Sequence, residues 1–190
     1  MKVSLPNRPA SGERLSTVAY TDFETPLGPM RIAASLAAQG LAGAWFVHDQ
    51  KYVPPLTSLW VSAPDSPLLS EARSEIEAWF AGKQQHFATA LAPQGTPFQQ
   101  VVWQGLLEIG YGETETYSGL TARLGQPATA VRAVAGAIGR NPVSVLIPCH
   151  RVLGRDGSLT GYAGGLARKR ALLDLEQSGC VVGRPFVLTG

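Results

Sequence analysis

Apolar residues in the first fifty positions occur in short runs that turn-forming residues separate. This pattern predicts three β-strands, at residues 17–21, 30–34 and 41–47. Pro26-Leu27-Gly28-Pro29 lies between the first two runs, and Gly40 precedes the third. Because Pro and Gly favour turns, we expect these strands to fold back on one another as a small antiparallel sheet.

Two later segments show the 3.6-residue spacing of a helix, each with a proline in its first turn. Ser66-Pro67 begins the first, which ends before Gly82, and Thr96-Pro97 begins the second, which ends at Gly110. The proline-containing stretch 53–67 is expected to be a connection. The first half of the chain is therefore predicted to be a sheet with one helix.

Two short helical segments, 118–124 and 127–139, follow and are joined by Gly125-Gln126. Their lengths and the glycine between them fit a helix-turn-helix, a pattern shared by other corners between two helices. The second segment is rich in alanine, and its only nearby charges are Arg132 within it and Arg140 directly after it. Small side chains allow a helix to approach a phosphate backbone closely, and arginines supply counter-charge. This helix is the candidate DNA-contacting element.

The candidate nucleophile comes next. Asn141-Pro142 closes the second helical segment, and the apolar, β-branched run 143–147 predicts a short buried strand that ends at Pro148. Cys149 and His150 follow on a turn. A thiol at the end of a rigid strand, beside an imidazole, is typical of a reactive nucleophile with a base.

The remaining chain offers a partner for that imidazole. Residues 155–158 predict a hairpin turn between 152–153 and 159–160. A last helix is expected at residues 166–177, and it offers two carboxylates, Asp174 and Glu176, that could orient the base.

Composition and charge add little to this picture. With 45% hydrophobic and 16% charged residues, the 190-residue chain is typical of a globular protein of one or two domains. The net charge of +2 is too small to indicate nucleic acid by itself. From Gln94 onward there are nine Lys or Arg against six Asp or Glu, and before it seven against eight. A polyanion-binding face is therefore expected in the second half.

Several classes are excluded by what the sequence lacks. No apolar run approaches the ~20 residues of a membrane span, and residues 1–14 are too polar and proline-rich for a secretion signal. We therefore expect a cytoplasmic protein whose two cysteines, Cys149 and Cys180, are reduced. The histidines and cysteines lack metal-ligand spacing, so no zinc site is expected.

Pro148-Cys149-His150-Arg151-Val152 resembles the active-site motif of the O6-alkylguanine-DNA alkyltransferases, also called methylated-DNA–protein-cysteine methyltransferases. The resemblance is strong from Thr96 to Glu176 and loose in the first half, where it rests on Thr25-Pro26-Leu27-Gly28. Further matches fall in the family's order and spacing at Thr96-Pro97-Phe98-Gln99, Val102-Trp103, Tyr117, Arg132-Ala133-Val134, Asn141-Pro142, Gly161-Tyr162-Ala163-Gly164-Gly165 and Lys169.

This resemblance implies an α+β fold of two domains. Residues 1–93 would form a scaffold, a small antiparallel sheet with a helix (RNase H-like). Residues 94–190 would form a mostly helical domain that carries the helix-turn-helix (winged-helix-like) and the active site. The implied partner is double-stranded DNA with an alkylated guanine, bound by a monomer that can assemble along DNA.

The resemblance also implies a reaction, DNA repair by direct reversal of damage. The alkyl group of O6-alkylguanine, and by extension O4-alkylthymine, would pass irreversibly to Cys149 after the base has rotated out of the duplex. The reaction would occur once per molecule, and neither a metal nor an organic cofactor is expected. A relay would run from Cys149 through a water to His150 and Glu176. Asn141 would brace the active-site turn, and Tyr117 would hydrogen-bond to the departing guanine.

DNA contacts are implied for four residues. Arg132 would fill the gap left by the rotated base, and Ala133, Arg140 and Arg151 would contact the duplex. The base pocket would be formed by Tyr117, Val152, Tyr162, Ala163 and Gly164.

Three alternatives remain open from the sequence. A cysteine hydrolase would use Cys149 and His150 on acyl substrates. A DNA-binding module that recognises alkylated bases without repairing them would lack the cysteine, so Cys149 argues against it. An alkylation-responsive transcription activator would need a further cysteine-bearing domain.

Overall fold

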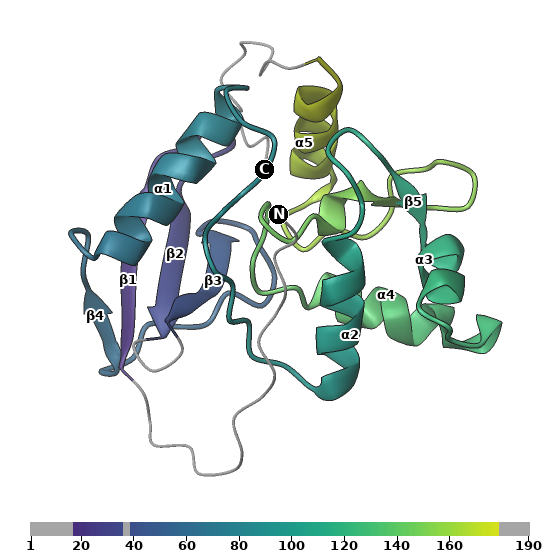
Figure 1. Cartoon of the computed structure of the whole chain (residues 1–190), viewed down its shortest axis with the longest axis horizontal. Helices are drawn as coiled ribbons and strands as arrows, with labels where there is room; N and C mark the ends of the chain where they lie inside the picture. Colours follow the sequence, from purple (N-terminus) through teal and green to yellow (C-terminus); the bar gives the residue numbers. More distant parts are fainter. Residues whose placement is uncertain (1–16, 36–38, 179–190) are drawn as a thin grey trace.

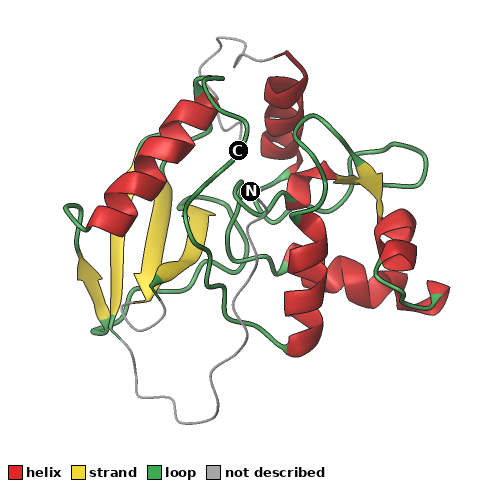
Figure 2. Ribbon diagram, viewed as in Figure 1, coloured by secondary structure: helices red, strands yellow, loops and turns green. Residues whose placement is uncertain are grey.

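The computed structural model describes residues 17–35 and 39–178, and it has a mixed α+β fold in two parts (Figure 1). A sheet with one helix forms the first part, and the other helices gather in the second (Figure 2). Cys180 lies outside the described residues. The sheet has the order β3-β2-β1-β4. Its strands are β1 (Val18–Phe23), β2 (Met30–Ser35), β3 (Gly40–Phe46) and β4 (Trp60–Ser62).

The three predicted strands are confirmed as an antiparallel series, but the sheet is mixed. β4 pairs in parallel with β1, and the Val18 amide donates to the Leu59 carbonyl at 2.9 Å. We expected this stretch to be only a connection. β4 has only three residues, which is too short for a periodic pattern in the sequence. It forms because the edge of β1 offers free backbone hydrogen-bonding groups.

Helix α1 (Pro67–Phe80) packs on one face of the sheet. Its buried residues recur every three to four positions, at Leu69, Ala72, Ile76 and Trp79, which is the spacing of one helical face. The helix begins with a proline in its first turn and ends before Gly82, as the sequence predicted.

The second part begins with α2 (Pro97–Leu106), which starts at a capping box. The Thr96 hydroxyl accepts from the Gln99 amide, while the Gln99 side chain accepts from the Thr96 amide. The Trp103 indole donates to the Ala137 carbonyl at 2.9 Å and so joins α2 to α4.

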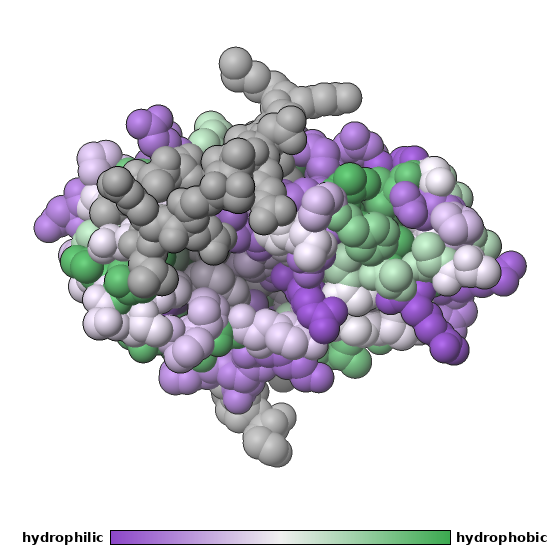
Figure 3. Space-filling model, turned by 90° about the horizontal axis from the view of Figure 1, so that it is seen from below, coloured by the Kyte–Doolittle hydropathy of each residue, from purple (hydrophilic) through white to green (hydrophobic). Residues whose placement is uncertain are grey.

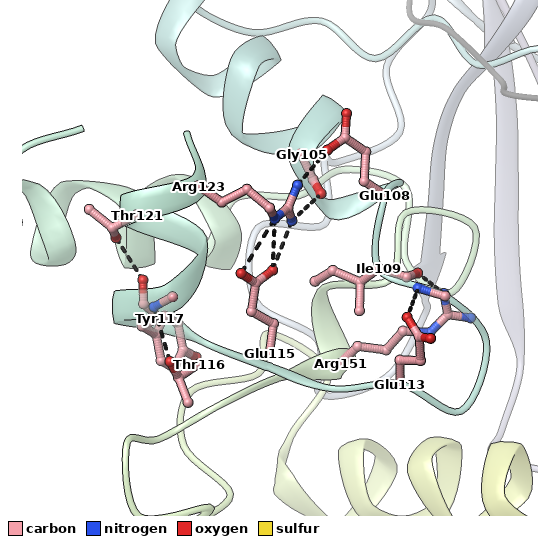
Figure 4. Close-up of polar contacts among 12 residues, drawn as sticks. Gly105, Glu108, Ile109, Glu113, Glu115, Thr116, Tyr117, Thr121, Arg123 and Arg151 are labelled. Atoms are coloured by element: carbon pink, nitrogen blue, oxygen red, sulfur yellow. Dashed lines mark hydrogen bonds and ion pairs between the residues drawn. The ribbon is translucent and has the colours of Figure 1, made fainter. Parts of the chain in front are cut away.

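Helices α3 (Tyr117–Arg123) and α4 (Val131–Gly139) form the predicted pair. A 3-10 turn, η1 (Ala128–Ala130), leads into α4, and Gly125 lies at a φ of +66° in the turn after α3. Figure 4 shows the Arg123 guanidinium between Glu108 and Glu115, where it also donates to the Gly105 carbonyl. This cluster fixes α3 against the end of α2.

The predicted strand at 143–147 is wrong. This segment is a compact turn in which Val145 has a φ of +74°, and only Val143 makes a β-bridge, to Ala44 of β3. The Ala44 amide donates to the Pro142 carbonyl at 2.9 Å, and the Ala44 carbonyl accepts from the Ser144 amide at 2.8 Å. The N-terminal sheet is thus bonded directly to the segment that leads to Cys149.

The predicted hairpin is also only partly present. The turn at 154–158 forms, but β6 (Val152–Leu153) pairs in parallel with β5 (Glu115–Thr116) and not with residues 159–160. Helix α5 (Leu166–Ser178) then packs beside the cysteine turn. No helix in the described ranges is both long and apolar enough to cross a membrane.

Candidate active site

Cys149 opens a 3-10 turn, η2 (Cys149–Arg151), and is 5% exposed. The Asn141 side chain braces this turn. Its Nδ2 donates to the Cys149 Sγ at 3.1 Å and to the Ile147 carbonyl at 2.8 Å. Its Oδ1 accepts from the Val143 amide at 2.9 Å, which fixes the orientation of the amide group. Asn141 therefore holds the cysteine turn and presents an N–H to the sulfur.

His150 is fully buried, and its two ring nitrogens have different surroundings. Nε2 lies 2.8 Å from the Glu176 Oε1. Because an ionised carboxylate only accepts, this contact assigns the proton of the neutral ring to Nε2. Nδ1 is buried and has no hydrogen-bond partner among the described residues, so its lone pair is free to accept a proton.

Glu176 is held ionised by the groups around it. Arg151 donates from Nη2 to Oε1 at 2.8 Å and from Nε to Oε2 at 3.0 Å, and the Gly112 amide donates to Oε2 at 3.2 Å. Burial alone would raise the pKa of this carboxyl. The hydrogen bonds and charges of His150 and Arg151 outweigh burial and lower the pKa of Glu176 to about 2.

The thiol and the imidazole are both neutral at rest. Burial raises the pKa of the Cys149 thiol, and the Asn141 hydrogen bond and the Lys169 charge only partly oppose it. Burial lowers the pKa of His150 in spite of Glu176. At rest the site therefore contains a neutral thiol and a neutral imidazole. The thiolate forms only when the thiol proton is transferred.

Lys169 joins two segments beside the cysteine. Its fully buried ammonium donates to the Val152 carbonyl at 2.5 Å and to the Thr160 carbonyl at 2.7 Å. Burial lowers the pKa of Lys169 to about 8. The Tyr117 hydroxyl, at the start of α3, donates to the same Thr160 carbonyl at 3.1 Å. Lys169 thus fixes β6, which follows the cysteine turn, relative to the loop that contains Thr160.

The other predicted pocket residues, apart from Tyr117 on α3, lie on this loop and strand. Val152 and Tyr162 are buried, and Ala163 is partly exposed. Gly164 lies under the Tyr162 ring, where an added Cβ would come within 2.8 Å of a ring carbon. Glycine at this position therefore lets the tyrosine ring pack close to the backbone.

Three of the four predicted DNA contacts lie on the surface. Arg132, Ala133 and Arg140 are exposed on α4 or at its end. Arg151 is not, because its guanidinium points inward to Glu176. Its Nη1 also donates to the Ile109 carbonyl at 2.6 Å (Figure 4). We therefore correct the expectation for Arg151. It belongs to the histidine–glutamate network and not to the DNA face.

Comparison with known proteins identifies the family. Residues 97–178 match the model of the 6-O-methylguanine DNA methyltransferase, DNA binding domain. The methylated-DNA–protein-cysteine methyltransferase of Methanosarcina barkeri is 43% identical over 159 residues, which are 84% of this chain and 97% of that protein. The chain belongs to the methylated-DNA–protein-cysteine methyltransferases.

Comparison with further proteins gives the same methyltransferase family. The protein of that name from Mycobacterium bovis is 43% identical over 85% of this chain and 93% of its own length. The crystal structure of Mycobacterium tuberculosis OGT in complex with DNA matches with a TM-score of 0.79 and 41% identity, over 86% of this chain and 95% of that one. Membership in the methyltransferase family decides against the cysteine hydrolase, and the presence of Cys149 argues against a module that binds alkylated bases without repairing them.

Sequence reasoning missed two features of this methyltransferase site. Trp79 of α1 lies with its ring edge-on to His150, and Arg151 supports Glu176. Trp79 has ordinary core spacing on its helix, so no sequence signal distinguished it. Among the described residues, no group of three or more His, Cys, Asp or Glu is placed to hold a metal ion.

Proposed function

We propose that Cys149 removes the alkyl group from O6 of guanine in duplex DNA, in one displacement. The sulfur–carbon bond forms as the bond between that carbon and O6 breaks, and the electron pair of the broken bond leaves with guanine. The observation that carries this proposal is a buried thiol, fixed by Asn141 and adjacent in sequence to His150. The Nε2 of His150 contacts Glu176, and its Nδ1 has no hydrogen-bond partner in the described part of the chain.

The proton of the thiol goes to His150. We place a water between the Cys149 Sγ and the His150 Nδ1, because adjacent side chains diverge and no group in residues 17–35 or 39–178 hydrogen-bonds to this buried nitrogen. The imidazolium that forms is stabilised by the ionised Glu176, 2.8 Å from Nε2. Arg151 keeps Glu176 ionised throughout, since it neutralises the carboxylate in the interior.

Tyr117 assists the departing guanine. Its hydroxyl is half-buried, and burial raises its pKa, so it stays protonated and able to donate. In the structure it donates to the Thr160 and Gly161 carbonyls at 3.1 and 3.2 Å. We infer that it exchanges one of these contacts for the purine, which receives a proton or a hydrogen bond as the alkyl group leaves. Tyr162, Val152, Ala163 and Gly164 enclose the base.

The damaged nucleotide must leave the duplex to reach a sulfur that is 5% exposed. α4 is the surface against which this occurs, with Arg132 filling the gap, Ala133 beside it and Arg140 at the helix end. Figure 3 shows hydrophobic residues gathered at the right, on the side of the C-terminal helices. A surface of small apolar side chains fits close to a groove and reads no base sequence, which suits repair at any position.

The finer architecture belongs to the same proposal. We assign residues 1–93 to an RNase H-like scaffold domain and 94–190 to a winged-helix-like DNA-binding domain. The antiparallel β1–β3 series covered by α1, and the α3–α4 pair followed by the 154–158 turn, support this assignment. The protein is proposed to bind alkylated duplex DNA as a monomer that can assemble along the duplex.

Intact-protein mass spectrometry tests the function directly. After incubation with a duplex containing O6-methylguanine, we expect the chain to gain the mass of one methylene, on the peptide with Cys149, in an amount that never exceeds one per molecule. Cys149→Ala should bind the duplex without gaining mass. More than one demethylated base per molecule would show turnover and contradict an irreversible transfer.

A further inference from the structure

The turn after β3, residues 48–53, has an unusual conformation for its residues. Tyr52 is 64% exposed and has a φ of +65°, and Asp49 has a φ of +63°. A bulky aromatic residue rarely adopts a positive φ, and it does so only where the surrounding structure holds it there. An exposed ring gains little burial energy to offset that cost. The turn therefore holds the Tyr52 ring at the surface without any gain from packing of the ring itself.

Buried Gln50 anchors the middle of this turn, since its Oε1 accepts from the Phe46 amide at 2.9 Å and from the Ser144 hydroxyl at 3.3 Å. Two further contacts, from Lys51 and Tyr52, reach the C-terminal half. The Lys51 amide donates to the carbonyl of Ala163, in the loop proposed to enclose the base, at 2.9 Å. The Arg140 guanidinium, at the end of α4, lies over the Tyr52 ring at 5.7 Å from its centroid. The turn is thus fastened both to the base pocket and to the helix proposed to face DNA.

The groups that the turn presents suit a nucleic-acid backbone. The Lys51 side chain is exposed and makes no ion pair within the described ranges. Asp49, the nearest acidic residue in sequence, acts electrostatically on Arg168. An unpaired ammonium binds phosphate, and an exposed ring beside an arginine packs on sugar or base. Lys51, Tyr52 and Arg140 together form a small cationic and aromatic surface.

We propose that Lys51 and Tyr52 extend the DNA interface onto the N-terminal half. Lys51 contacts a phosphate next to the rotated nucleotide, and Tyr52 packs on the adjoining sugar–phosphate backbone while it orients Arg140. This inference rests on the proposed function, because it places the same duplex on α4. It gives the N-terminal half a direct contact with substrate.

Fluorescence anisotropy with an unmodified duplex and the full chain tests Lys51. Removing one phosphate contact should lower affinity on the order of threefold to tenfold at physiological salt, and reduce the slope of log K against log salt by ~0.9. Lys51→Ala should show both changes, and Lys51→Arg should restore the slope. Lys83→Ala is the matched control, because Lys83 is also an exposed lysine of the N-terminal half, beyond the end of α1.

Tyr52→Gly separates a functional role from a structural one. Glycine adopts a positive φ without strain, so the thermal unfolding midpoint should stay the same or rise, while DNA affinity falls. Unchanged affinity in Lys51→Ala and Tyr52→Gly, or an equal loss in Lys83→Ala, would overturn the inference. If the wild-type chain still takes up a methyl group, the proposed function survives that result. If it takes up none, the proposed function falls and this inference falls with it.

Discussion

Trp79 of the N-terminal helix packs edge-on against His150 of the active site, with 6.3 Å between ring centroids and an interplanar angle of 73°. Both side chains are fully buried. The ring excludes water from one side of the imidazole, and burial is the largest cause of the lowered pKa of His150. The N-terminal half therefore takes part in setting the protonation state of the base.

Replacing Trp79 should change the pH dependence of alkyl transfer. Trp79→Ala opens a cavity that hydrates His150 and raises its pKa, so the rising limb of the rate against pH should move to higher pH. Stability should fall by about 3–5 kcal/mol, as for other buried tryptophans. Single-turnover rates from pH 5 to 9 and urea unfolding measure these effects.

Leu69→Ala provides the control for that loss of stability. Leu69 is also fully buried on α1, but it lies near the opposite end of the helix from Trp79. It should cost about 2–5 kcal/mol without moving the pH profile. If both variants shift the profile equally, the tryptophan acts only through general stability.

Glu176→Gln should slow the transfer by about a hundredfold, within the range of general acid–base effects. The amide cannot stabilise the imidazolium, and it leaves the buried Arg151 without a counter-ion. Asp174→Asn tests the other carboxylate of the same helix, which is exposed, and its rate should equal that of the wild type. Rapid-quench measurement of methyl uptake would distinguish the two, and a slow Asp174→Asn variant would contradict the assignment.

Stability should fall at acid pH in a window set by Glu176. Its pKa in the folded state is about 2 against an ordinary value of 4.5. Since the folded pKa is lowered, its contribution is complete above pH 4.5 and is lost as pH falls through 2, about 3 kcal/mol in all. Neutral burial of His150 adds a loss that begins below its ordinary pKa of 6.5. Urea unfolding across this range should show a smaller acid-dependent loss in Glu176→Gln than in the wild type.

Arg132→Ala should slow repair in duplex DNA more than reaction with a free alkylated base. The Arg132 side chain fills the gap in the base stack and so offsets a few kcal/mol of unstacking. Its loss should slow duplex repair by about tenfold to a hundredfold. A free base needs no rotation out of a stack, and Arg132 is exposed on α4. Arg170→Ala removes an exposed arginine from α5 and should affect neither rate strongly. If Arg132→Ala slows the reaction equally on both substrates, Arg132 does not fill the gap left by the rotated base.

The sequence by itself determined the features that depend on a few neighbouring residues. Thr96 and Gln99 define the start of α2, Gly125 defines the turn between α3 and α4, and Pro148-Cys149-His150 places thiol and imidazole on one turn. Caps, turns and helical faces are encoded locally, because their hydrogen bonds and spacings span only three to five residues.

Only the tertiary structure decided where these features meet. The apolar run 143–147 looks like a strand, yet Asn141 and the edge of β3 satisfy its backbone as a turn. Arg151 looks like a DNA contact, yet Glu176 and the Ile109 carbonyl draw it inside. Trp79 reaches His150 from 71 residues away in the chain. Such outcomes depend on partners distant in sequence, whose proximity arises only when the two halves pack together.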